Sequence, residues 1–334
     1  MLRLGIVGCG RVTTMFHLRA IKETGELSSF AVMDRNESNM YRVKKMCGAE
    51  RCYSSFHQLL MDAEVDALVI NTPPEFHEGM VLDALKAGKH VLCEKPLATS
   101  VEGGLRIKEE SEKSGLTVMT VHNYSFTPCL GEIESQIRSG ILGDIQKICI
   151  KFETNLRNYG AKTDFRLKKE FGIVEDVLPH ILSCTHKIAG GSVRVLDGDP
   201  AKRSFRVVDN LNLIMETDKG VEIDSFMSWT KVIPTFKMSF KGTCGSITTD
   251  LIRMPFGYKI EIGGERKEVF GKKGLKVYLD LLRFRHPGFV NQYSHFRKVI
   301  MKNEPPRFTM DDEITMIKMM QNALHYLTRN NGLG

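Results

Sequence analysis

The stretch LRLGIVGCGRVT, residues 2–13, decides the fold of this chain. Its first half is a short apolar run, typical of a buried β-strand, and Gly8 and Gly10 follow directly. Glycines between a strand and a helix allow a tight turn and let the backbone approach a pyrophosphate, which then lies at the helix N-terminus. Apolar residues at helical spacing continue over residues 11–22, so the strand–turn–helix context is complete. The stretch therefore predicts a dinucleotide-binding Rossmann unit.

The acid after the second strand supports this prediction. Residues 30–33 are apolar and lead to Asp34, at the position where an acid binds the ribose hydroxyls of NAD. Its carboxylate would repel the 2′-phosphate of NADP, so NAD is favoured, while the adjacent Arg35 keeps NADP open as an alternative. Thr13 stands where glycine or alanine is usual, which predicts a looser approach of the helix to the strand but keeps the phosphate site.

Strands and helices alternate up to about residue 122. Strands are predicted at 2–7, 30–33, 67–70, 90–93 and 116–121, and helices at 11–22, 75–87 and 105–114. Alternation of this kind predicts a doubly wound parallel sheet with helices on both faces.

After residue 123 the alternation of strands and helices gives way to a series of strands, several of them separated by turns that contain glycine. A helix is predicted at 130–139, strands at 145–152, 203–208, 212–217, 221–229, 236–240, 246–250 and 258–262, and two final helices at 289–301 and 312–328. The turns at 218–220 and 263–264 favour antiparallel hairpins. We therefore predict an α/β chain in which a Rossmann domain, 1–122, precedes an α+β domain, 123–334, with a largely antiparallel open sheet. The second domain would bind substrate and hold subunits together, and the last helix is a candidate to pack back on the first.

Composition excludes several classes of protein. The 334 residues carry a formal net charge of +7, but basic residues are spread among acids and no nucleic-acid motif is present, so no nucleic-acid partner is expected. No apolar run reaches membrane-spanning length, and no signal-peptide cleavage site is visible. The eight cysteines form no CxxC pair, and together these features predict the cytoplasm. Cys47, Cys52 and His57 lack the second half of a ligand set, so no metal is expected.

Further motifs resemble one family. NTPPEFH at 71–77, EKP at 94–96, SGILGDI at 139–145 and FKGTCGS at 240–246 are similar to the Gfo/Idh/MocA family, the glucose-fructose oxidoreductase and inositol dehydrogenase group. The resemblance runs over nearly the whole chain. NTPP followed about twenty residues later by EKP is more specific to this family than to Rossmann proteins in general.

The resemblance implies a cofactor site. In the family the lysine of EKP, here Lys95, points into the active site beside the nicotinamide, and Glu94 helps to hold the cofactor ribose. Pro96, often cis in relatives, would fix a turn that aims the lysine. The expected cofactor-binding residues are Gly8, Gly10, Arg11, Val12, Asp34, Arg35, Thr72, Pro73, His77, Glu94 and Lys95.

The stretch 165–180 is similar to the family segment that carries an aspartate and, four residues later, a histidine, here Asp176 and His180. Positions i and i+4 share one helix face. Pro179 is expected in the first helical turn, which would place Asp176 at or near the N-cap. The surroundings depart from the family pattern, which leaves the substrate open. The resemblance also implies three substrate-binding residues, Asn123, Tyr124 and Arg166. Residues 283–286, which include Arg283, Arg285 and His286, are read as a solvated loop.

The predicted chemistry is reversible hydride transfer between nicotinamide and a secondary alcohol carbon of a sugar, polyol or sugar derivative. His180 would accept the hydroxyl proton, because histidines exchange protons near neutral pH, and Lys95 would stabilise charge on the same oxygen. The two could exchange roles, and Asp176 would orient the substrate or the histidine.

Two alternatives stay open: a non-catalytic NAD(P)-binding regulator, and redox-neutral, NAD-assisted glycosidic cleavage. Relatives associate through the antiparallel sheet, so a homodimer or homotetramer is expected. Phe226, Trp229 and Phe240 are the candidates for the outer sheet face.

Overall fold

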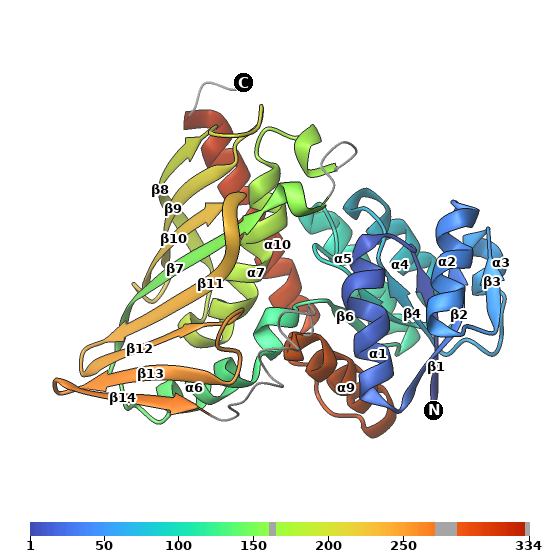
Figure 1. Ribbon diagram of the computed structural model, residues 1–334, viewed down its shortest axis with the longest axis horizontal. Helices are drawn as coiled ribbons and strands as arrows, with labels where there is room; N and C mark the ends of the chain where they lie inside the picture. Colours follow the sequence, from blue (N-terminus) through green and yellow to red (C-terminus); the bar gives the residue numbers. More distant parts are fainter. Residues whose placement is uncertain (160–164, 271–285, 331–334) are drawn as a thin grey trace. The chain divides into compact units, whose positions relative to one another are not determined.

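The computed structural model describes residues 1–159, 165–270 and 286–330. The chain divides into two compact units, Met1–Asn123 with Gly288–Ile317, and Tyr124–Pro287 with Lys318–Gly334. The predicted fold class is confirmed, because a parallel sheet comes first in the chain and a mostly antiparallel sheet follows (Figure 1).

The first unit is built on a six-stranded sheet. Its strands are β1 (Leu2–Val7), β2 (Leu27–Met33), β3 (Arg51–Tyr53), β4 (Ala67–Ile70), β5 (His90–Cys93) and β6 (Val118–Thr120). They lie in the order β3-β2-β1-β4-β5-β6, and every neighbouring pair is parallel. The chain order therefore reverses between β1 and β4, which is where open parallel sheets bind ligands beyond the carboxyl ends of their strands.

Helices connect these strands. They are the π-helical turn η1 (Thr13–His17), α1 (Leu18–Thr24), α2 (Glu37–Cys47), α3 (Phe56–Leu60), the 3-10 turn η2 (Pro74–Phe76), α4 (His77–Lys86) and α5 (Val101–Ser114). The predicted helix at 11–22 is thus present, although it begins with a π-helical turn. Strand β3 and helices α2 and α3 were not predicted.

The chain returns to the first unit near its C-terminal end. Helix α9 (Pro287–Lys302) places the Tyr293 hydroxyl 2.7 Å from Nδ1 of His17. Helix α10 (Met310–Asn330) places Glu313 3.0 Å from Nε2 of His122, just after β6. All four side chains are buried. Residues far apart in sequence therefore complete the core of this unit.

The second unit is built on an eight-stranded sheet. Its strands are β7 (Ile145–Asn155), β8 (Val193–Ala201), β9 (Asn210–Thr217), β10 (Glu222–Ser228), β11 (Thr230–Gly242), β12 (Gly245–Asp250), β13 (Gly257–Ile262) and β14 (Glu265–Phe270). The order is β14-β13-β12-β11-β7-β10-β9-β8, and only β7 and β10 pair in parallel among these strands. The turns predicted at 218–220 and 263–264 both join antiparallel strands, β9 to β10 and β13 to β14, although β14 itself was not predicted.

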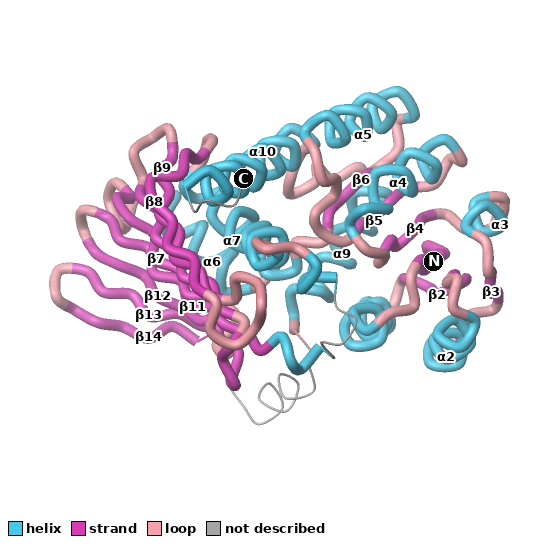
Figure 2. The backbone as a smooth tube through the Cα atoms, turned by 90° about the horizontal axis from the view of Figure 1, so that it is seen from above, coloured by secondary structure: helices cyan, strands magenta, loops and turns pink. Residues whose placement is uncertain are grey.

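Helices α6 (Pro128–Arg138) and α7 (Gly172–Ala189) lie on one face of this sheet, with the later part of α10 (Figure 2). Short 3-10 turns η3 (Asn123–Phe126), η4 (Leu156–Tyr159) and η6 (Phe165–Lys168) complete the described elements. The other face of the sheet carries no helix from the described ranges (Figure 2).

The strand predicted at 203–208 is wrong. The buried Asp209 carboxylate accepts hydrogen bonds from the backbone N–H groups of Arg203, Ser204 and Phe205, at 2.9, 2.5 and 2.8 Å. These amides converge on one side chain and so cannot form a strand ladder. The segment is a loop that ends at Asp209.

Two strands of the second unit escaped prediction, and both are edge strands. Strand β8 contains Gly198 and Pro200, which are unfavourable inside a sheet, and its register shifts between Val195 and Asp197. Strand β14, ERKEVF, is dominated by charge. Charged and irregular edges oppose strand pairing with other chains, and for the same reason they do not resemble strands in sequence.

The predicted outer-face aromatics are corrected at two positions. Trp229 and Phe240 are fully buried, so neither is exposed on the open face. Phe226 alternates with the buried Ser225 and Met227 and lies on that open face, where the ammonium of Lys151 is 5.6 Å from its ring centroid. The open face is therefore mainly polar rather than aromatic.

Candidate active site

The glycine turn has the geometry that a dinucleotide requires. Gly8 has φ +88°, and a Cβ there would lie 2.7 Å from the carbonyl oxygen of Asn71, so only glycine fits between β1 and β4. The region where a Cβ of Gly10 would lie is open, with nothing within 4 Å. Gly8 therefore closes the turn, and Gly10 leaves room for a ligand to approach the backbone.

Thr13 contributes more than its sequence position predicts. It is fully buried, its hydroxyl donates to the carbonyl of Gly8 at 2.6 Å, and the Asn71 side-chain amide donates to it at 3.0 Å. A threonine in place of the usual small residue thus fastens the first helical turn to the glycine turn and to the end of β4.

Asp34 lies beside the same turn. One of its oxygens accepts from the backbone N–H of Cys9 at 2.7 Å, and the other accepts from that of Asn36 at 2.8 Å. Burial, with a contribution from the Asp34 charge, raises the pKa of the Cys9 thiol to about 12, so this cysteine is not a reactive thiolate. The guanidinium of Arg35 lies 5.4 Å from the ring centroid of Phe76.

A cavity of about 480 Å³ opens along this edge of the sheet. It is lined by Gly8, Gly10, Met33, Asp34, Arg35, Ser54, Ser55, Phe56, Asn71, Thr72, Pro73, Phe76 and Met80. Six residues predicted to bind the cofactor are among them: Gly8, Gly10, Asp34, Arg35, Thr72 and Pro73. Ser54, Ser55 and Phe56 follow β3 and Asn71 follows β4, so the rule that ligands lie beyond the carboxyl ends of strands could have identified these four once β3 was recognised.

Five predicted cofactor residues lie outside this lining: Arg11, Val12, His77, Glu94 and Lys95. Arg11 is exposed, with Nε 3.2 Å from the sulfur of Met15, and Val12 directly precedes η1. His77 is fully buried, with Nδ1 2.7 Å from the carbonyl of Pro96 and Nε2 2.8 Å from that of Thr72. Its ring therefore links the NTPP loop to the EKP turn.

Glu94 and Lys95 follow β5, at the same edge of the sheet. The Lys95–Pro96 peptide is cis, and the backbone N–H of Glu94 donates to Ile70 of β4 at 2.8 Å. One Glu94 oxygen lies 3.0 Å from Nε2 of His17, and the other accepts from the backbone N–H of Lys95 at 3.2 Å. Burial favours a raised pKa, but the hydrogen bond from His17 and the charges of His17 and Lys95 outweigh it, so the pKa of Glu94 is lowered.

The second unit brings the other predicted catalytic residues together on α7. Asp176 Oδ1 pairs with Nε of Arg166 at 3.0 Å, and its Oδ2 accepts from the indole N–H of Trp229 at 3.2 Å. One turn later the His180 ring stacks on Phe152, with centroids 5.7 Å apart. Trp229, which was not predicted as a site residue, thus helps to hold the Asp176 carboxylate.

The predicted start of this helix is wrong. Helix α7 begins at Gly172, with Phe171 as N-cap, so Asp176 is an interior residue and Pro179 lies inside the helix. Proline there removes the N–H that would bond the carbonyl of Glu175. A Cβ at Gly172 would meet the carbonyl oxygen of Arg166, so glycine is needed at this first helical position.

Tyr124 borders His180, with ring centroids 5.0 Å apart, and it also meets His286 at 5.1 Å. His286 is partly buried, and its Nε2 lies 2.8 Å from the carbonyl of Leu251. Burial lowers the pKa of His286 to about 4. It is therefore part of this aromatic cluster and not the solvated loop residue that the sequence indicated. Arg283 and Arg285 lie outside the described residues. Asn123 is buried at the end of the first unit.

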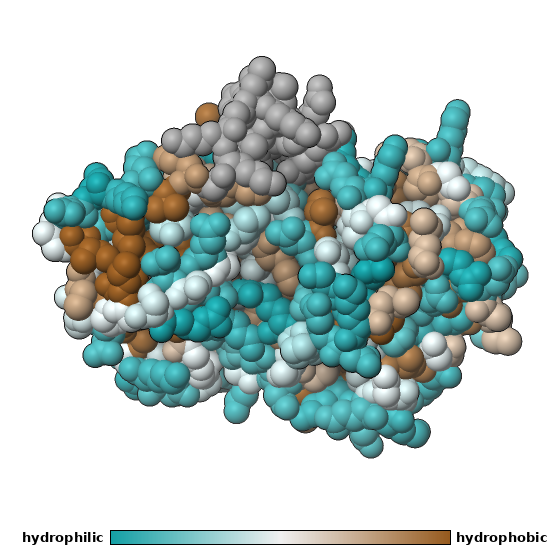
Figure 3. Space-filling view, turned by 90° about the horizontal axis from the view of Figure 1, so that it is seen from below, coloured by the Kyte–Doolittle hydropathy of each residue, from teal (hydrophilic) through white to brown (hydrophobic). Residues whose placement is uncertain are grey.

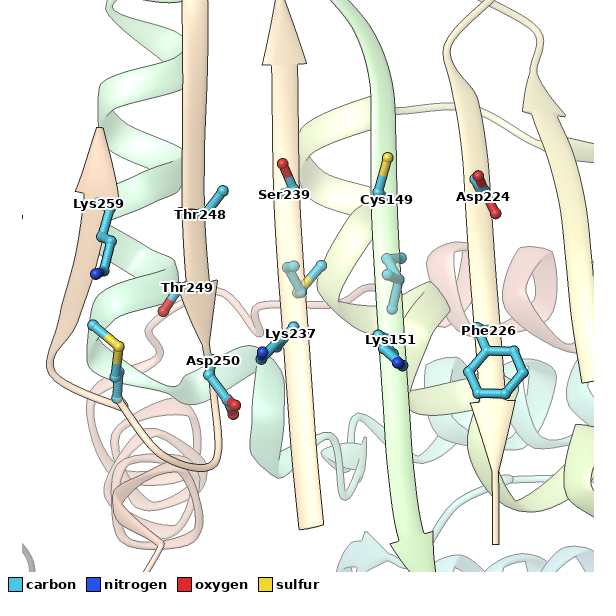
Figure 4. Close-up of a pocket in the computed structure, with 13 residues that line it drawn as sticks. Cys149, Lys151, Asp224, Phe226, Lys237, Ser239, Thr248, Thr249, Asp250 and Lys259 are labelled. Carbon is cyan, nitrogen blue, oxygen red and sulfur yellow. The ribbon is translucent and has the colours of Figure 1, made fainter. Parts of the chain in front are cut away.

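The open face of the second sheet carries a groove of about 580 Å³ (Figure 4). Lys151, Lys237 and Lys259 rise from β7, β11 and β13 (Figure 4). Asp250 lies between Lys259 and Lys237, and Asp224 lies on β10, beyond the strand of Lys151 (Figure 4). Within the described ranges no three His, Cys, Asp or Glu side chains are close enough to share a metal ion. No described helix is long and apolar enough to cross a membrane.

Comparison with known proteins agrees with these features. Residues 2–122 match the family model of an oxidoreductase family with an NAD-binding Rossmann fold, and residues 131–248 match the GFO/IDH/MocA C-terminal domain. The chain is 25% identical over 329 residues to a myo-inositol 2-dehydrogenase of Thermotoga maritima, covering 93% of this chain and 92% of the relative. It is 27% identical over 282 residues to a glucose-6-phosphate 3-dehydrogenase of Bacillus subtilis, covering 80% and 73%.

Solved structures share the fold. A levoglucosan dehydrogenase in complex with NADH and levoglucosan superposes with a TM-score of 0.86 at 15% identity, covering 98% of this chain and 97% of that one. A 3-ketoreductase from Actinomadura kijaniata, in complex with NADP, gives 0.80 at 20% identity, with 96% of each chain covered. The chain thus belongs to the Gfo/Idh/MocA family of NAD(P)-dependent oxidoreductases.

Proposed function

We propose that this protein is a dehydrogenase or reductase that transfers a hydride between a nicotinamide cofactor and a secondary alcohol carbon of a sugar, polyol or sugar derivative. The observation that carries the proposal is the glycine turn at Gly8 and Gly10 beside Asp34, opening on a cavity at the switch point of a parallel sheet. The chain also keeps Lys95, Asp176 and His180, the residues that the family resemblance assigns to chemistry. The names of the relatives support a sugar or polyol substrate.

The proposed roles follow from the surroundings of each side chain. Bound nicotinamide supplies the hydride chemistry. His180 accepts or returns the hydroxyl proton, with its ring held by Phe152, and Lys95 stabilises negative charge on the substrate oxygen. His180 and Lys95 could exchange these roles. Asp176 orients Arg166 through their ion pair, and Arg166, Tyr124 and Asn123 form the proposed substrate contacts.

NAD is the proposed cofactor, with NADP as the alternative. Asp34 lies in the cavity lining with a carboxylate that disfavours a 2′-phosphate. Arg35 is the residue that would accommodate that phosphate, but its guanidinium lies against the ring of Phe76. This contact favours a role for Arg35 against an aromatic or base face rather than a phosphate.

A homodimer or homotetramer is also part of the proposal. Supporting it, the groove on the open sheet face mixes lysines and aspartates, a pattern that a two-fold partner can complement with the same surface. On the face that Figure 3 shows, apolar surface gathers at the left, toward β12–β14. Sedimentation as a monomer at micromolar concentration would contradict an oligomer. The eight cysteines, all free, support the cytoplasm as the proposed compartment.

The test is reduced-nicotinamide absorbance with NAD and with NADP over polyols, sugars, sugar acids and nucleotide sugars. Wild type is compared with Lys95→Met and His180→Ala, and with Lys267→Met as the matched control, because Lys267 is an exposed lysine on edge strand β14. Activity with one substrate class that is lost in both site variants and kept in the control supports the proposal. NAD binding without net NADH formation on any substrate would favour the regulator, or redox-neutral cleavage if a glycoside is consumed.

A further inference from the structure

Two buried polar groups, His17 and Tyr293, form a hydrogen-bonded chain behind Glu94. Nδ1 of His17 is 2.7 Å from the hydroxyl of Tyr293, and its Nε2 is 3.0 Å from a Glu94 oxygen. His17 and Tyr293 are 0% and 1% exposed, and the side chain of Glu94 is 13% exposed. The ring of Phe289 meets the edge of the His17 ring at 5.3 Å. Burial of this kind strengthens each hydrogen bond and makes it costly to lose.

The partners determine the protonation of the chain. A carboxylate only accepts hydrogen bonds, so Nε2 of His17 carries the hydrogen that it donates to Glu94. The Tyr293 hydroxyl can donate to Nδ1 of a neutral ring or accept from Nδ1 of a protonated ring, so both ring nitrogens keep a hydrogen-bond partner in either form. The second Glu94 oxygen accepts from the backbone N–H of Lys95.

We propose that His17 and Tyr293 form a buried relay that holds the Glu94 carboxylate ionised and in one orientation beside Lys95, and so act as positioning residues for the nicotinamide cofactor. The inference rests on the proposed function, because Glu94 must serve the cofactor site. Three elements that are distant in sequence build the relay: η1, the turn after β5, and α9. Neither His17 nor Tyr293 has a place in the proposed hydride-transfer step.

The relay makes a prediction about pH. The ionisable groups around Glu94 are His17 on η1, Tyr293 on α9, Lys95 in its own turn and the buried thiol of Cys93 on β5. Burial opposes the ionised form of Glu94, while the hydrogen bond from His17 favours it. Without that bond, burial prevails, the pKa of Glu94 rises, and a cofactor that needs the carboxylate binds less well as the pH falls.

The experiment measures NAD⁺ affinity by calorimetry from about pH 5 to 8, a range above the usual carboxylate pKa. We expect constant affinity for wild type. Tyr293→Phe removes only the hydroxyl and should weaken binding about three- to tenfold, the effect of one hydrogen bond. His17→Leu should weaken it more, and increasingly so toward pH 5. His17→Gln, whose amide can still donate to Glu94, should restore much of the loss and the flat pH dependence.

The matched control is Tyr258→Phe, which removes another buried tyrosine hydroxyl, on β13 in the second unit. It should bind NAD⁺ as wild type does at every pH. Circular dichroism and urea midpoints establish that each variant is folded, and Tyr293→Phe and His17→Gln give a result should His17→Leu fail to fold. Wild-type affinity and pH dependence in folded Tyr293→Phe and His17→Leu would overturn the relay.

Failure of the proposed function gives a different pattern. A wild type that binds NAD⁺ but reduces none with any substrate contradicts the dehydrogenase, while NAD⁺ affinity still decides the relay. A wild type that binds neither NAD⁺ nor NADP⁺ contradicts both. In an active enzyme, kcat and the KM for NAD⁺ should change in the relay variants, with the KM for the second substrate unchanged.

Discussion

Gly8 and Gly10, two positions apart in one turn, should respond differently to the same added methyl group. In Gly8→Ala the new Cβ lies 2.7 Å from the carbonyl oxygen and 2.9 Å from the carbonyl carbon of Asn71, both backbone atoms, at φ +88°. The left-handed backbone costs about 1–2 kcal/mol for a residue with a Cβ, and overpacking against backbone adds about 1–3 kcal/mol. The free energy of unfolding should therefore fall by about 2–5 kcal/mol.

Gly10→Ala should leave stability within about 1 kcal/mol of wild type, because nothing lies within 4 Å of the new Cβ and its φ is outside the left-handed region. Its effect should be on the cofactor, since the methyl group enters the space where a pyrophosphate approaches the backbone. We expect a loss of NAD⁺ affinity of about tenfold or more, equivalent to about 1.4 kcal/mol.

Urea unfolding and NAD⁺ calorimetry on both variants separate the two effects. Wild-type stability in Gly8→Ala would refute the close contact between the glycine turn and β4. Wild-type affinity in Gly10→Ala would refute the path of the cofactor over this turn. A large loss of stability in Gly10→Ala would contradict the open space beside that residue.

Three further predictions concern the second unit. Burial lowers the pKa of His286 to about 4, so on acidification the unfolded chain takes up a proton at this histidine before the folded chain does. The free energy of unfolding should therefore fall by up to about 3 kcal/mol between about pH 6.5 and 4. Urea titrations over this pH range should show that the free energy of unfolding falls less steeply in His286→Gln than in wild type. Equal slopes in the two proteins would contradict the contribution of His286. Asp209→Ala leaves three backbone N–H groups without their acceptor and should lower the free energy of unfolding, measured in urea, by about 3 kcal/mol. The control Asp199→Ala, at an exposed position on β8, should change it by less than about 0.5 kcal/mol. Trp229→Phe removes the hydrogen bond to Asp176 and should lower kcat/KM about three- to tenfold while folding is kept; an unchanged kcat/KM would show that this carboxylate needs no such support.

Local patterns made most of the first unit predictable. A short, continuous apolar run such as residues 67–70 is typical of a central strand that is covered on both faces. The bounds predicted for this strand are those of β4 in the structure. The glycine turn and Asp34 were also predictable from local sequence, because the backbone geometry of the turn requires glycine and the end of the second strand is where the acid is expected. Three of the lining residues that were not predicted, Ser54, Ser55 and Phe56, follow β3, a short strand that the sequence did not reveal.

Long-range contacts set the limit of prediction in the second unit. Residues 203–208 have a strand-like pattern, but the decisive partner is a carboxylate that lies beyond them in the chain. Proline is tolerated in a first helical turn, which predicts a helix start near Asp176, yet α7 begins at Gly172 and contains Pro179 in its interior. Trp229 could be seen as a large apolar residue, but its bond to Asp176 joins residues 53 positions apart and leaves no local signal.

The return of α9 and the start of α10 to the first unit has a consequence for biogenesis. When the ribosome has made residues 1–123, all six strands of the parallel sheet exist, but His17 and His122 still lack Tyr293 and Glu313. Residues 124–287 must be translated first, which takes on the order of ten seconds at usual elongation rates. During that interval the nascent Rossmann sheet is an incomplete domain whose future core is exposed. Chaperones that recognise apolar surface would meet this protein at that stage, and a premature stop before α9 would release a sheet that cannot close its core.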